Sequence, residues 1–373
     1  MDGSGFPLSR DWGAEVLNSL NGRDWLETGE APSVAVVVPA RNRVEKTLRF
    51  IEAFKKQTYT NYTLFIVDSA STDGTPDQVR QAHPDVVVLL ATDDDFWTGA
   101  TNIGVRAALD AHFDYVLTIN DDSVIMETYL EDVVRIAVLY NQPILGCRID
   151  FMAQPGLIWS IGSGHHWGSS SLFDLNYYNV REEELTPLVR EAFLLPVESM
   201  PGNGVLIARR VFEAIGLYDE ENTPHYHADT EFMLRARSRG FMPMVTCQAI
   251  VYNDCDLPAS GHSLMSLRSA LNPRRLIHVA DNIHWMFTKK KSHYYFKAYR
   301  YIINAYGPKH LRRRSTTAYI GHVVADALGV QNLPLRLCRA ILHRVERISP
   351  RLGTRLRRFA AERLGLSKGL SAH

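Results

Sequence analysis

The strongest constraint on the fold is an alternation between apolar runs and segments with helical spacing over residues 33–120. Residues 34–38 are all apolar and mostly β-branched, as expected for a strand that is covered on both faces. Further buried strands are predicted at residues 64–67, 86–90 and 115–119, with helices between them at 45–56, 75–82 and 99–111. This alternation predicts an α/β fold with a mainly parallel, doubly wound sheet flanked by helices. Ligands of such sheets bind beyond the carboxyl ends of the strands.

The remaining sequence divides the 373-residue chain into three parts. Residues 1–32 have no clear periodicity and are expected to form an irregular lead-in, whereas the α/β domain is expected to span residues 33–258. Within this domain residues 150–200 are expected to be rich in loops. The regular pattern then resumes and predicts strands at 204–208 and 244–247 and helices at 209–215 and 229–239. Residues 259–373 are expected to form a basic helical extension.

Composition and cysteine usage indicate the compartment. No uninterrupted apolar stretch approaches the roughly 18–20 residues that span a bilayer. Residues 1–5 also lack the basic and then apolar layout of a secretory signal. The four cysteines contain no Cys-x-x-Cys pair, which argues against a zinc knuckle and against a disulfide framework. These features predict a cytoplasmic protein.

The net charge of zero conceals a strong asymmetry along the chain. Residues 268–373 contain 22 Lys and Arg but four Asp and Glu, so residues 1–267 carry an excess of 18 acidic side chains. Near residues 335–366, apolar residues recur at three- and four-residue steps beside many arginines, which predicts amphipathic helices. Such helices suit adsorption to an anionic membrane surface. Packing against the acidic body and homodimer formation are the alternatives, and no nucleic-acid motif accompanies the basic residues.

Two adjacent carboxylates follow the predicted strand at 115–119. Asp121 and Asp122 come directly after Asn120, and neighbouring carboxylates at the end of a buried strand repel each other. Folding tolerates them where a cation or a satisfied hydrogen-bond network neutralises them. A hard divalent cation that also bridges the phosphates of a nucleotide fits this requirement. The same residues suit a turn or a helix N-cap, so that interpretation stays open.

Other polar motifs follow the remaining strands or open the following helices. They are Pro-Ala-Arg-Asn-Arg at 39–43, Asp-Ser-Ala-Ser-Thr-Asp-Gly-Thr at 68–75, Trp-Thr-Gly-Ala-Thr-Asn-Ile-Gly at 97–104, Pro-Gly-Asn-Gly at 201–204 and His-Ala-Asp-Thr-Glu-Phe at 227–232. In these motifs, their order and their spacing, residues 33–256 resemble a family 2 glycosyltransferase with the GT-A fold. The resemblance is to bacterial transferases of the rhamnosyl and galactofuranosyl type, which act in surface polysaccharide synthesis.

The resemblance implies a nucleotide site at the ends of the first strands. Asp68 matches the family acid that bonds the nucleobase, and a carboxylate can accept a hydrogen bond from a pyrimidine N3–H. Asn102 matches a polar residue that lies near the base or ribose. The implied nucleotide-binding residues are Pro39, Ala40, Arg41, Asp68, Ser69, Asn102 and Asp121.

The resemblance also implies a Mg²⁺ or Mn²⁺ site, with Asp122 as the direct ligand and Asp121 as a ribose or additional metal contact. The family motif usually begins with Asp, where this chain has Asn120. Family members often carry a further histidine ligand after the last strand, where this chain has Asn253. The third ligand therefore stays open. The candidates are Asp254, Asn253 and His227, with His225 and His262 as further possibilities.

Asp229 aligns with the family's general base, which takes the proton of the attacking sugar hydroxyl. Its position also suits a helix N-cap, and that alternative stays open. The residues expected to orient the acceptor are Glu231, Arg235, Gly202, Asn203 and Trp97. His165 and His166, beside Trp167, are further candidates for the acceptor cleft, although exposed loop histidines are commoner.

These expectations combine into a metal-dependent inverting glycosyltransferase. It would move one hexosyl or deoxyhexosyl group from a UDP- or dTDP-sugar to a hydroxyl of a glycan or lipid-linked glycan in cell-surface polysaccharide synthesis. It would act in the cytoplasm, with peripheral attachment to the inner face of the cytoplasmic membrane. The Gln-x-x-Arg-Trp motif of processive synthases is absent from the sequence, which favours few additions per encounter.

Two alternatives remain from the sequence. A sugar nucleotidyltransferase also uses a nucleotide-binding α/β sheet and Mg²⁺, but it normally has a glycine-rich loop after the first strand, where this chain has Pro-Ala-Arg-Asn-Arg. A catalytically degenerate transferase could instead act as a membrane-associated scaffold. The presence of both Asp122 and Asp229 argues against that loss of activity.

Overall fold

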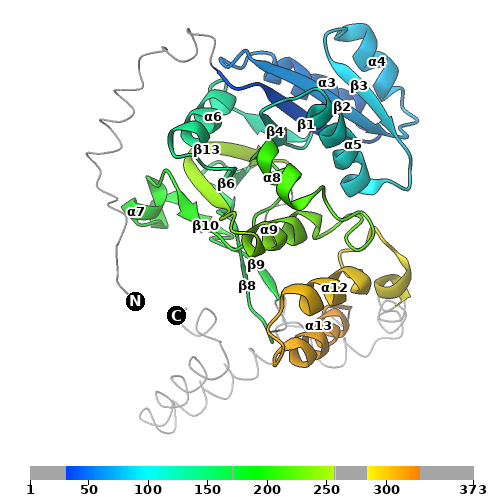
Figure 1. Cartoon of the computed structure of the whole chain (residues 1–373), viewed down its shortest axis with the longest axis vertical. Coiled ribbons are helices and arrows are strands. Elements are labelled where there is room, and N and C mark those ends of the chain that lie inside the picture. The colour runs from blue at the N-terminus through cyan, green and yellow to red at the C-terminus, as the bar shows by residue number, and fades with distance from the viewer. Residues whose placement is uncertain (1–30, 170–171, 256, 258–283, 328–373) are drawn as a thin grey trace.

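The computed structural model describes residues 31–169, 172–255, 257 and 284–327. One central sheet dominates the described part. Its strand order is β10 (Val180–Arg181), β7 (Leu157–Ser160), β6 (Ile144–Phe151), β12 (Val205–Ala208), β4 (Tyr115–Thr118), β1 (Val34–Ala40), β2 (Tyr62–Ser69) and β3 (Val87–Ala91). Figure 1 shows helices packed around this sheet and a separate pair, α12 and α13, at one end of the molecule. The predicted α/β fold with a mainly parallel sheet flanked by helices is therefore confirmed.

The first half of the domain follows the predicted alternation closely. Strand β1 pairs in parallel with β2 on one side and with β4 on the other, and β2 pairs in parallel with β3. Because these strands run the same way, their carboxyl ends meet at one edge of the sheet. The elements are β1 (Val34–Ala40), α3 (Val44–Phe54), β2 (Tyr62–Ser69), α4 (Thr75–Ala82), β3 (Val87–Ala91), α5 (Phe96–Asp110) and β4 (Tyr115–Thr118).

The second half contains more strands than the sequence predicts. Strand β12 is inserted antiparallel between β4 and β6, so the sheet is mixed. Residues 150–200 are rich in loops as expected, and several short strands and helical turns lie between these loops. The elements are β5 (Ser123–Ile125), α6 (Tyr129–Leu139), β6 (Ile144–Phe151), β7 (Leu157–Ser160), β8 (Ser163–His165), β9 (Phe173–Leu175), β10 (Val180–Arg181), η1 (Glu182–Glu184), α7 (Pro187–Arg190), β11 (Leu195–Pro196), β12 (Val205–Ala208), α8 (Arg209–Ile215), α9 (Ala228–Ser238) and β13 (Met244–Asn253).

Alternate residues of β1 build two separate cores. Val34, Val36 and Val38 face a cluster that includes side chains of α3, α4 and α6. Ala35 and Val37 face a second cluster that includes side chains of α5, α8 and α9. All five residues are fully buried, as expected for a strand covered on both faces.

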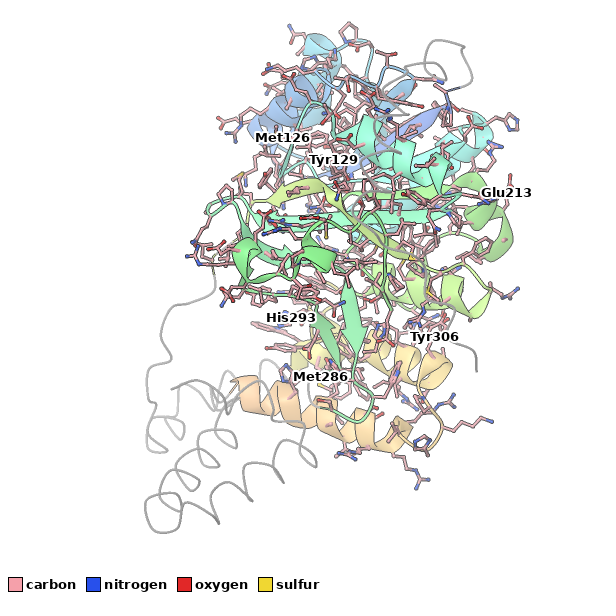
Figure 2. All side chains as sticks on the ribbon, turned by 90° about the vertical axis from the view of Figure 1, so that its left-hand side faces the viewer. Met126, Tyr129, Glu213, Met286, His293 and Tyr306 are labelled. Carbon is pink, nitrogen blue, oxygen red and sulfur yellow. The ribbon has the colours of Figure 1, made fainter. Side chains whose placement is uncertain are left out.

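Helices α12 (Phe296–Tyr306) and α13 (Arg312–Ala327) form the described part of the basic extension. A small core of Met286 and Tyr294 with Tyr319 and Val323 of α13 packs against Phe296 and Tyr299 of α12. Figure 2 shows Met286, His293 and Tyr306 at this end of the molecule, away from Met126 and Tyr129 in the sheet domain. No helix in the described residues is long and apolar enough to cross a membrane. The amphipathic helices expected near 335–366 lie outside the described residues.

Candidate active site

Asp121 and Asp122 lie just beyond β4, and a cation does neutralise them. Arg43, which follows β1, places its Nη1 3.0 Å from Asp121 Oδ1 and 2.7 Å from Asp122 Oδ2. Thr47 Oγ1, one turn into α3, donates to Asp121 Oδ2 at 2.9 Å. Burial raises the pKa of Asp121, and the neighbouring Arg43 partly opposes that effect. The repulsion between the two carboxylates that the sequence predicts is therefore reduced by Arg43 and Thr47.

One oxygen of this carboxylate pair remains available to a ligand. Asp122 Oδ1 is buried and has no hydrogen-bond partner among the described residues. Buried polar atoms without a partner are rare in native structures, so this oxygen can accept a contact from water, an ion or a ligand. No cluster of three or more His, Cys, Asp or Glu side chains arranged for a metal ion occurs in the described ranges. The donor set therefore fits Mg²⁺ or Mn²⁺ that takes one carboxylate here and its other ligands from phosphate and water.

The candidates for a third protein ligand differ in their surroundings, and among the described residues only His227 has a buried ring nitrogen, Nε2, without a hydrogen-bond partner. Asp254 forms an ion pair with Lys46 at 2.6 Å, and Asn253 ends β13 in register with Ser123 of β5. His227 packs its ring against Phe173, with centroids 5.0 Å apart. Burial lowers the pKa of His227 to about 4, so the ring is neutral at physiological pH. His262 lies outside the described residues.

Asp68, the expected nucleobase contact, lies near the end of β2. Its Oδ2 accepts the backbone N–H of Ser71 at 3.0 Å, while its Oδ1 is buried without a partner in the described part of the chain. Asn42, which has a left-handed backbone at φ 49°, accepts the N–H of Thr72 at 2.7 Å. The loops after β1 and β2 are therefore tied together around Asp68. Ser69 is buried at the end of β2.

Arg41 reaches across this edge of the sheet to the loop after β3. Its guanidinium pairs with Asp93, and Lys291, just ahead of α12, lies 3.4 Å from the same carboxylate oxygen. Pro39 and Ala40, the other residues of the motif implied to bind the nucleotide, form the end of β1. The basic extension therefore contacts the loop after β3, beside the edge where the parallel strands end.

Asn102 does not have the contacts expected of a nucleotide ligand. It is buried in α5, where its Nδ2 donates to Tyr218 O at 2.9 Å and to Glu220 Oε1 at 2.7 Å. Its Oδ1 accepts the N–H of Tyr218 at 3.1 Å. Both ends of the amide are thus engaged in holding residues 218–220, and this structural role corrects the expectation of a base or ribose contact.

Asp229 lies in the first turn of α9. Its Oδ2 accepts the N–H of Gly202 at 2.9 Å, and its Oδ1 accepts the N–H of Thr230 at 2.7 Å. Burial raises the pKa of this carboxyl, against the opposing effect of the two N–H donors. The N-cap residue of α9 is His227, in a left-handed conformation at φ 66°. Asp229 is therefore not the N-cap, and its carboxylate is held against the residue 201–204 motif.

The dipeptide Gly202-Asn203 links this carboxylate to the carboxylate pair. Gly202 donates its N–H to Asp229, and the next residue, Asn203, accepts the N–H of Asn120 through Oδ1 at 2.9 Å. Asn203 Nδ2 is buried without a partner among the described residues. The motifs at residues 120–122 and 227–232, which are more than 100 residues apart in the sequence, therefore both bind to Gly202-Asn203.

Trp97 joins the same two motifs from the side of α5. Its Nε1 donates to Asn120 Oδ1 at 3.3 Å. Its ring lies so close to Gly202 that a Cβ added there would be 2.8 Å from Trp97 Cη2 and 3.4 Å from Asp229 Cβ. Trp97 thus packs between the carboxylate motifs, and glycine at 202 is required by the close approach.

Glu231 and Arg235 do not face Asp229. Glu231 is fully buried and pairs with Arg235 Nη2 at 2.9 Å. It also accepts a hydrogen bond from the hydroxyl of Tyr306 at the end of α12. Arg235 further donates to the carbonyls of Ile215 and Leu217. Arg235 therefore pairs with a carboxylate of the same motif, and both side chains attach α9 to its neighbours, so their orienting role toward the acceptor stays a prediction.

The histidines of the residue 162–168 segment are divided between core and surface. His165 Nε2 lies 3.2 Å from the hydroxyl of the buried Ser199, and its ring stacks on Trp167 with centroids 5.9 Å apart. Burial lowers the pKa of His165 to about 4. His166 is exposed beside Asp174. His165 therefore packs in the interior, which corrects the expectation that it lines a cleft.

Sequence reasoning missed Arg43, Thr47 and Tyr306 as partners of the acidic side chains. Arg43 belongs to a motif that was noticed, but the pairing of β1 with β4 that brings it to the carboxylates is not visible in the sequence. The contact of Tyr306 with Glu231 spans 75 residues. No local signal in the sequence identifies it.

Part of the chain is similar to a known protein family, and the fold is similar to that of solved structures. Residues 35–182 match the family model described as Glycosyl transferase family 2, and no curated protein matches the sequence. The structure of GalNAc-T7 with UDP, GalNAc and Mn²⁺ is similar at a TM-score of 0.51 and 15% identity, over 77% of this chain and 54% of that one.

Two other solved structures are similar at lower scores. The mannosyltransferase PcManGT from Pyrobaculum calidifontis, in complex with GDP-Man and Mn²⁺, has a TM-score of 0.47 and 17% identity over 88% of this chain and 84% of that one. S. aureus TarS has a TM-score of 0.43 and 12% identity over 73% of this chain, which spans 44% of TarS. Residues 35–182 therefore match the glycosyl transferase family 2 model, and the chain has a fold similar to that of the glycosyltransferase GalNAc-T7.

Proposed function

We propose that this protein is a metal-dependent, inverting glycosyltransferase that moves a single sugar from a nucleoside diphosphate donor to a hydroxyl of an acceptor glycan. The observation that carries the proposal is the double role of Gly202-Asn203. Gly202 binds the carboxylate of Asp229, and Asn203 binds the backbone beside Asp121 and Asp122. The proposed proton acceptor, Asp229, and the proposed metal ligand, Asp122, are thereby held near each other at one edge of the sheet.

Asp229 is proposed to accept the proton of the attacking hydroxyl. A sugar hydroxyl is a poor nucleophile at neutral pH, and a carboxylate within hydrogen-bond reach can take its proton as the new bond forms. The raised pKa of Asp229 makes this carboxylate a better base than an exposed one. Attack from the side opposite the leaving diphosphate inverts the anomeric centre.

Asp68 and Asp122 are proposed to bind the donor. Each has a buried oxygen without a partner among the described residues, so each can accept a further contact without displacing a protein bond. Asp68 Oδ1 would accept from the nucleobase, and Asp122 Oδ1 would hold Mg²⁺ or Mn²⁺ with the diphosphate. The ion supplies positive charge that neutralises the departing diphosphate. The Mn²⁺ and UDP named for the GalNAc-T7 structure support this assignment.

The donor is proposed to be a UDP- or dTDP-sugar, and the acceptor a glycan or lipid-linked glycan of the cell surface. The basic extension supports an acceptor that is presented at an anionic membrane surface, because residues 268–373 carry 22 Lys and Arg against four acids. The enzyme would then work in the cytoplasm, at the inner face of the membrane.

A thermal-shift screen tests the proposal. A ligand that binds the folded state at about 100 times its Kd adds about 2.7 kcal/mol to the free energy of unfolding. We expect one or more UDP- or dTDP-sugars to raise the melting temperature with Mn²⁺ or Mg²⁺ present, and much less with EDTA. Nucleoside monophosphates serve as controls. If no nucleotide sugar in a broad panel shifts the melting temperature with either ion, the proposal is wrong.

A further inference from the structure

The carboxylate pair already holds a permanent cation. A single nitrogen, Arg43 Nη1, bridges Asp121 Oδ1 and Asp122 Oδ2. The two carboxylates are 2% and 17% exposed, whereas the Arg43 side chain is 45% exposed. The guanidinium of Arg43 therefore lies between the buried carboxylates and the solvent.

The contacts leave the acidic site only partly neutralised. Three of the four carboxylate oxygens are bound, two by Arg43 and one by Thr47. The fourth, Asp122 Oδ1, is buried and unpaired within the described residues. The guanidinium of Arg43 carries a full positive charge, because arginine does not lose its proton in proteins. The two carboxylates and the guanidinium together have a net charge of −1, which is the charge that an incoming divalent cation meets.

We propose that Arg43 is a positioning residue that fixes Asp122 with one oxygen toward the donor and prevents tight binding of a divalent cation before the donor diphosphate is present. The inference rests on the proposed function, since it concerns the same donor site. A cation that reaches Asp122 Oδ1 meets one carboxylate oxygen and a nearby guanidinium, which repels it. The diphosphate adds the negative charge and oxygen ligands that the protein lacks. Metal and nucleotide should therefore bind with strong positive coupling.

The binding of MnCl₂ to the nucleotide-free protein, followed by calorimetry and by Mn²⁺ electron paramagnetic resonance, tests this inference without any turnover. Wild type should bind Mn²⁺ weakly alone and at least tenfold more tightly when UDP is present. Arg43→Gln removes the positive charge, so we expect its affinity for Mn²⁺ alone to rise at least tenfold and the coupling to UDP to shrink. Arg43→Lys keeps the charge and should remain close to wild type.

Arg80→Gln is the matched control, because Arg80 is an exposed arginine whose ion pair with Asp77 lies on α4. It should leave Mn²⁺ binding unchanged, and thermal melting of every variant checks that the protein is folded. A folded Arg43→Gln variant with unchanged or weaker affinity for Mn²⁺ alone would overturn the inference.

Two further outcomes separate this inference from the proposed function. If wild type binds UDP equally well in EDTA and Arg43→Gln loses UDP binding, Arg43 takes the place of the metal, and the inference and the metal requirement are both wrong. If wild type binds no UDP-sugar or dTDP-sugar under any condition, the proposed function is wrong and the inference falls with it.

Discussion

Gly202→Ala should damage the proposed active site while adding a single methyl group. The new Cβ would lie 2.8 Å from Trp97 Cη2 and 3.1 Å from Trp97 Cζ2, closer than Cβ atoms normally approach other atoms. Trp97 cannot easily move away, because its Nε1 is bound to Asn120 and its ring packs edge-on against Tyr218 with centroids 5.6 Å apart. The backbone of residue 202 or the carboxylate of Asp229 must therefore shift.

The expected loss of stability follows from the insertion of a methyl group into a closely packed site. Forcing an extra methylene-sized group into such a site costs about 1–3 kcal/mol in the free energy of unfolding. For a domain of this size that corresponds to a fall of roughly 2–12 °C in melting temperature. Displacement of a catalytic group by about 1 Å can reduce turnover about 100-fold. We therefore expect a modest loss of stability and a much larger loss of sugar transfer.

Gly321→Ala provides the matched control for the same chemical change. Gly321 lies within α13, and an added Cβ there would meet no atom within 4 Å. Alanine in a helix interior is favoured over glycine by about 0.5–1 kcal/mol, so this variant should be slightly more stable. Melting temperature and UDP release would be measured for both variants. Equal stability and turnover of Gly202→Ala and wild type would refute the close packing between Trp97 and Asp229.

Three further predictions concern charge, pH and the attachment of α12. Asp122→Ala should weaken Mn²⁺ binding in the presence of UDP at least tenfold, or by about 1.4 kcal/mol, in calorimetry; an unchanged affinity would remove Asp122 from the site. Because burial raises the pKa of Asp229, its proton-accepting carboxylate form predominates only above the ordinary Asp pKa of about 3.9, so kcat should rise with pH along an acid limb above that value. If kcat instead rose with pH only at or below about pH 3.9, Asp229 would not be the proton acceptor. Tyr306→Phe removes a hydrogen bond to the fully buried Glu231 and should lower the free energy of unfolding by about 1.5–3 kcal/mol in urea, whereas an unchanged midpoint would show that the bond contributes nothing.

The sequence predicts the first half of the fold well because most residues in the middle of its strands are apolar. It fails at β6, whose interior contains Arg148 and Asp150 and therefore does not look like a buried strand. In the structure these two side chains bind each other at 2.7 Å and are both 1% exposed, so the strand is buried after all. Mutual neutralisation of charges is a tertiary property that a hydropathy pattern does not contain.

The site motifs could be located from the sequence, but the direction of each side chain could not. Asp229 and Glu231 are two residues apart on α9, and helix positions i and i+2 do not share a face. Glu231 accordingly points to Arg235 and Tyr306, whereas Asp229 points to Gly202. Asn102 likewise has its amide engaged with a segment 116 residues away, which no local pattern reveals.

The most direct test of the account separates donor binding from sugar transfer in Asp229→Asn, once the thermal-shift screen has identified the donor. The substitution removes the proton acceptor and leaves Asp68 and Asp122 in place. Calorimetry should give a donor affinity within about threefold of wild type, while transfer to the acceptor should fall by at least 100-fold, in line with the typical contribution of a general base. Transfer at the wild-type rate, or loss of donor binding together with transfer in a folded variant, would contradict the assignment of Asp229 as the base.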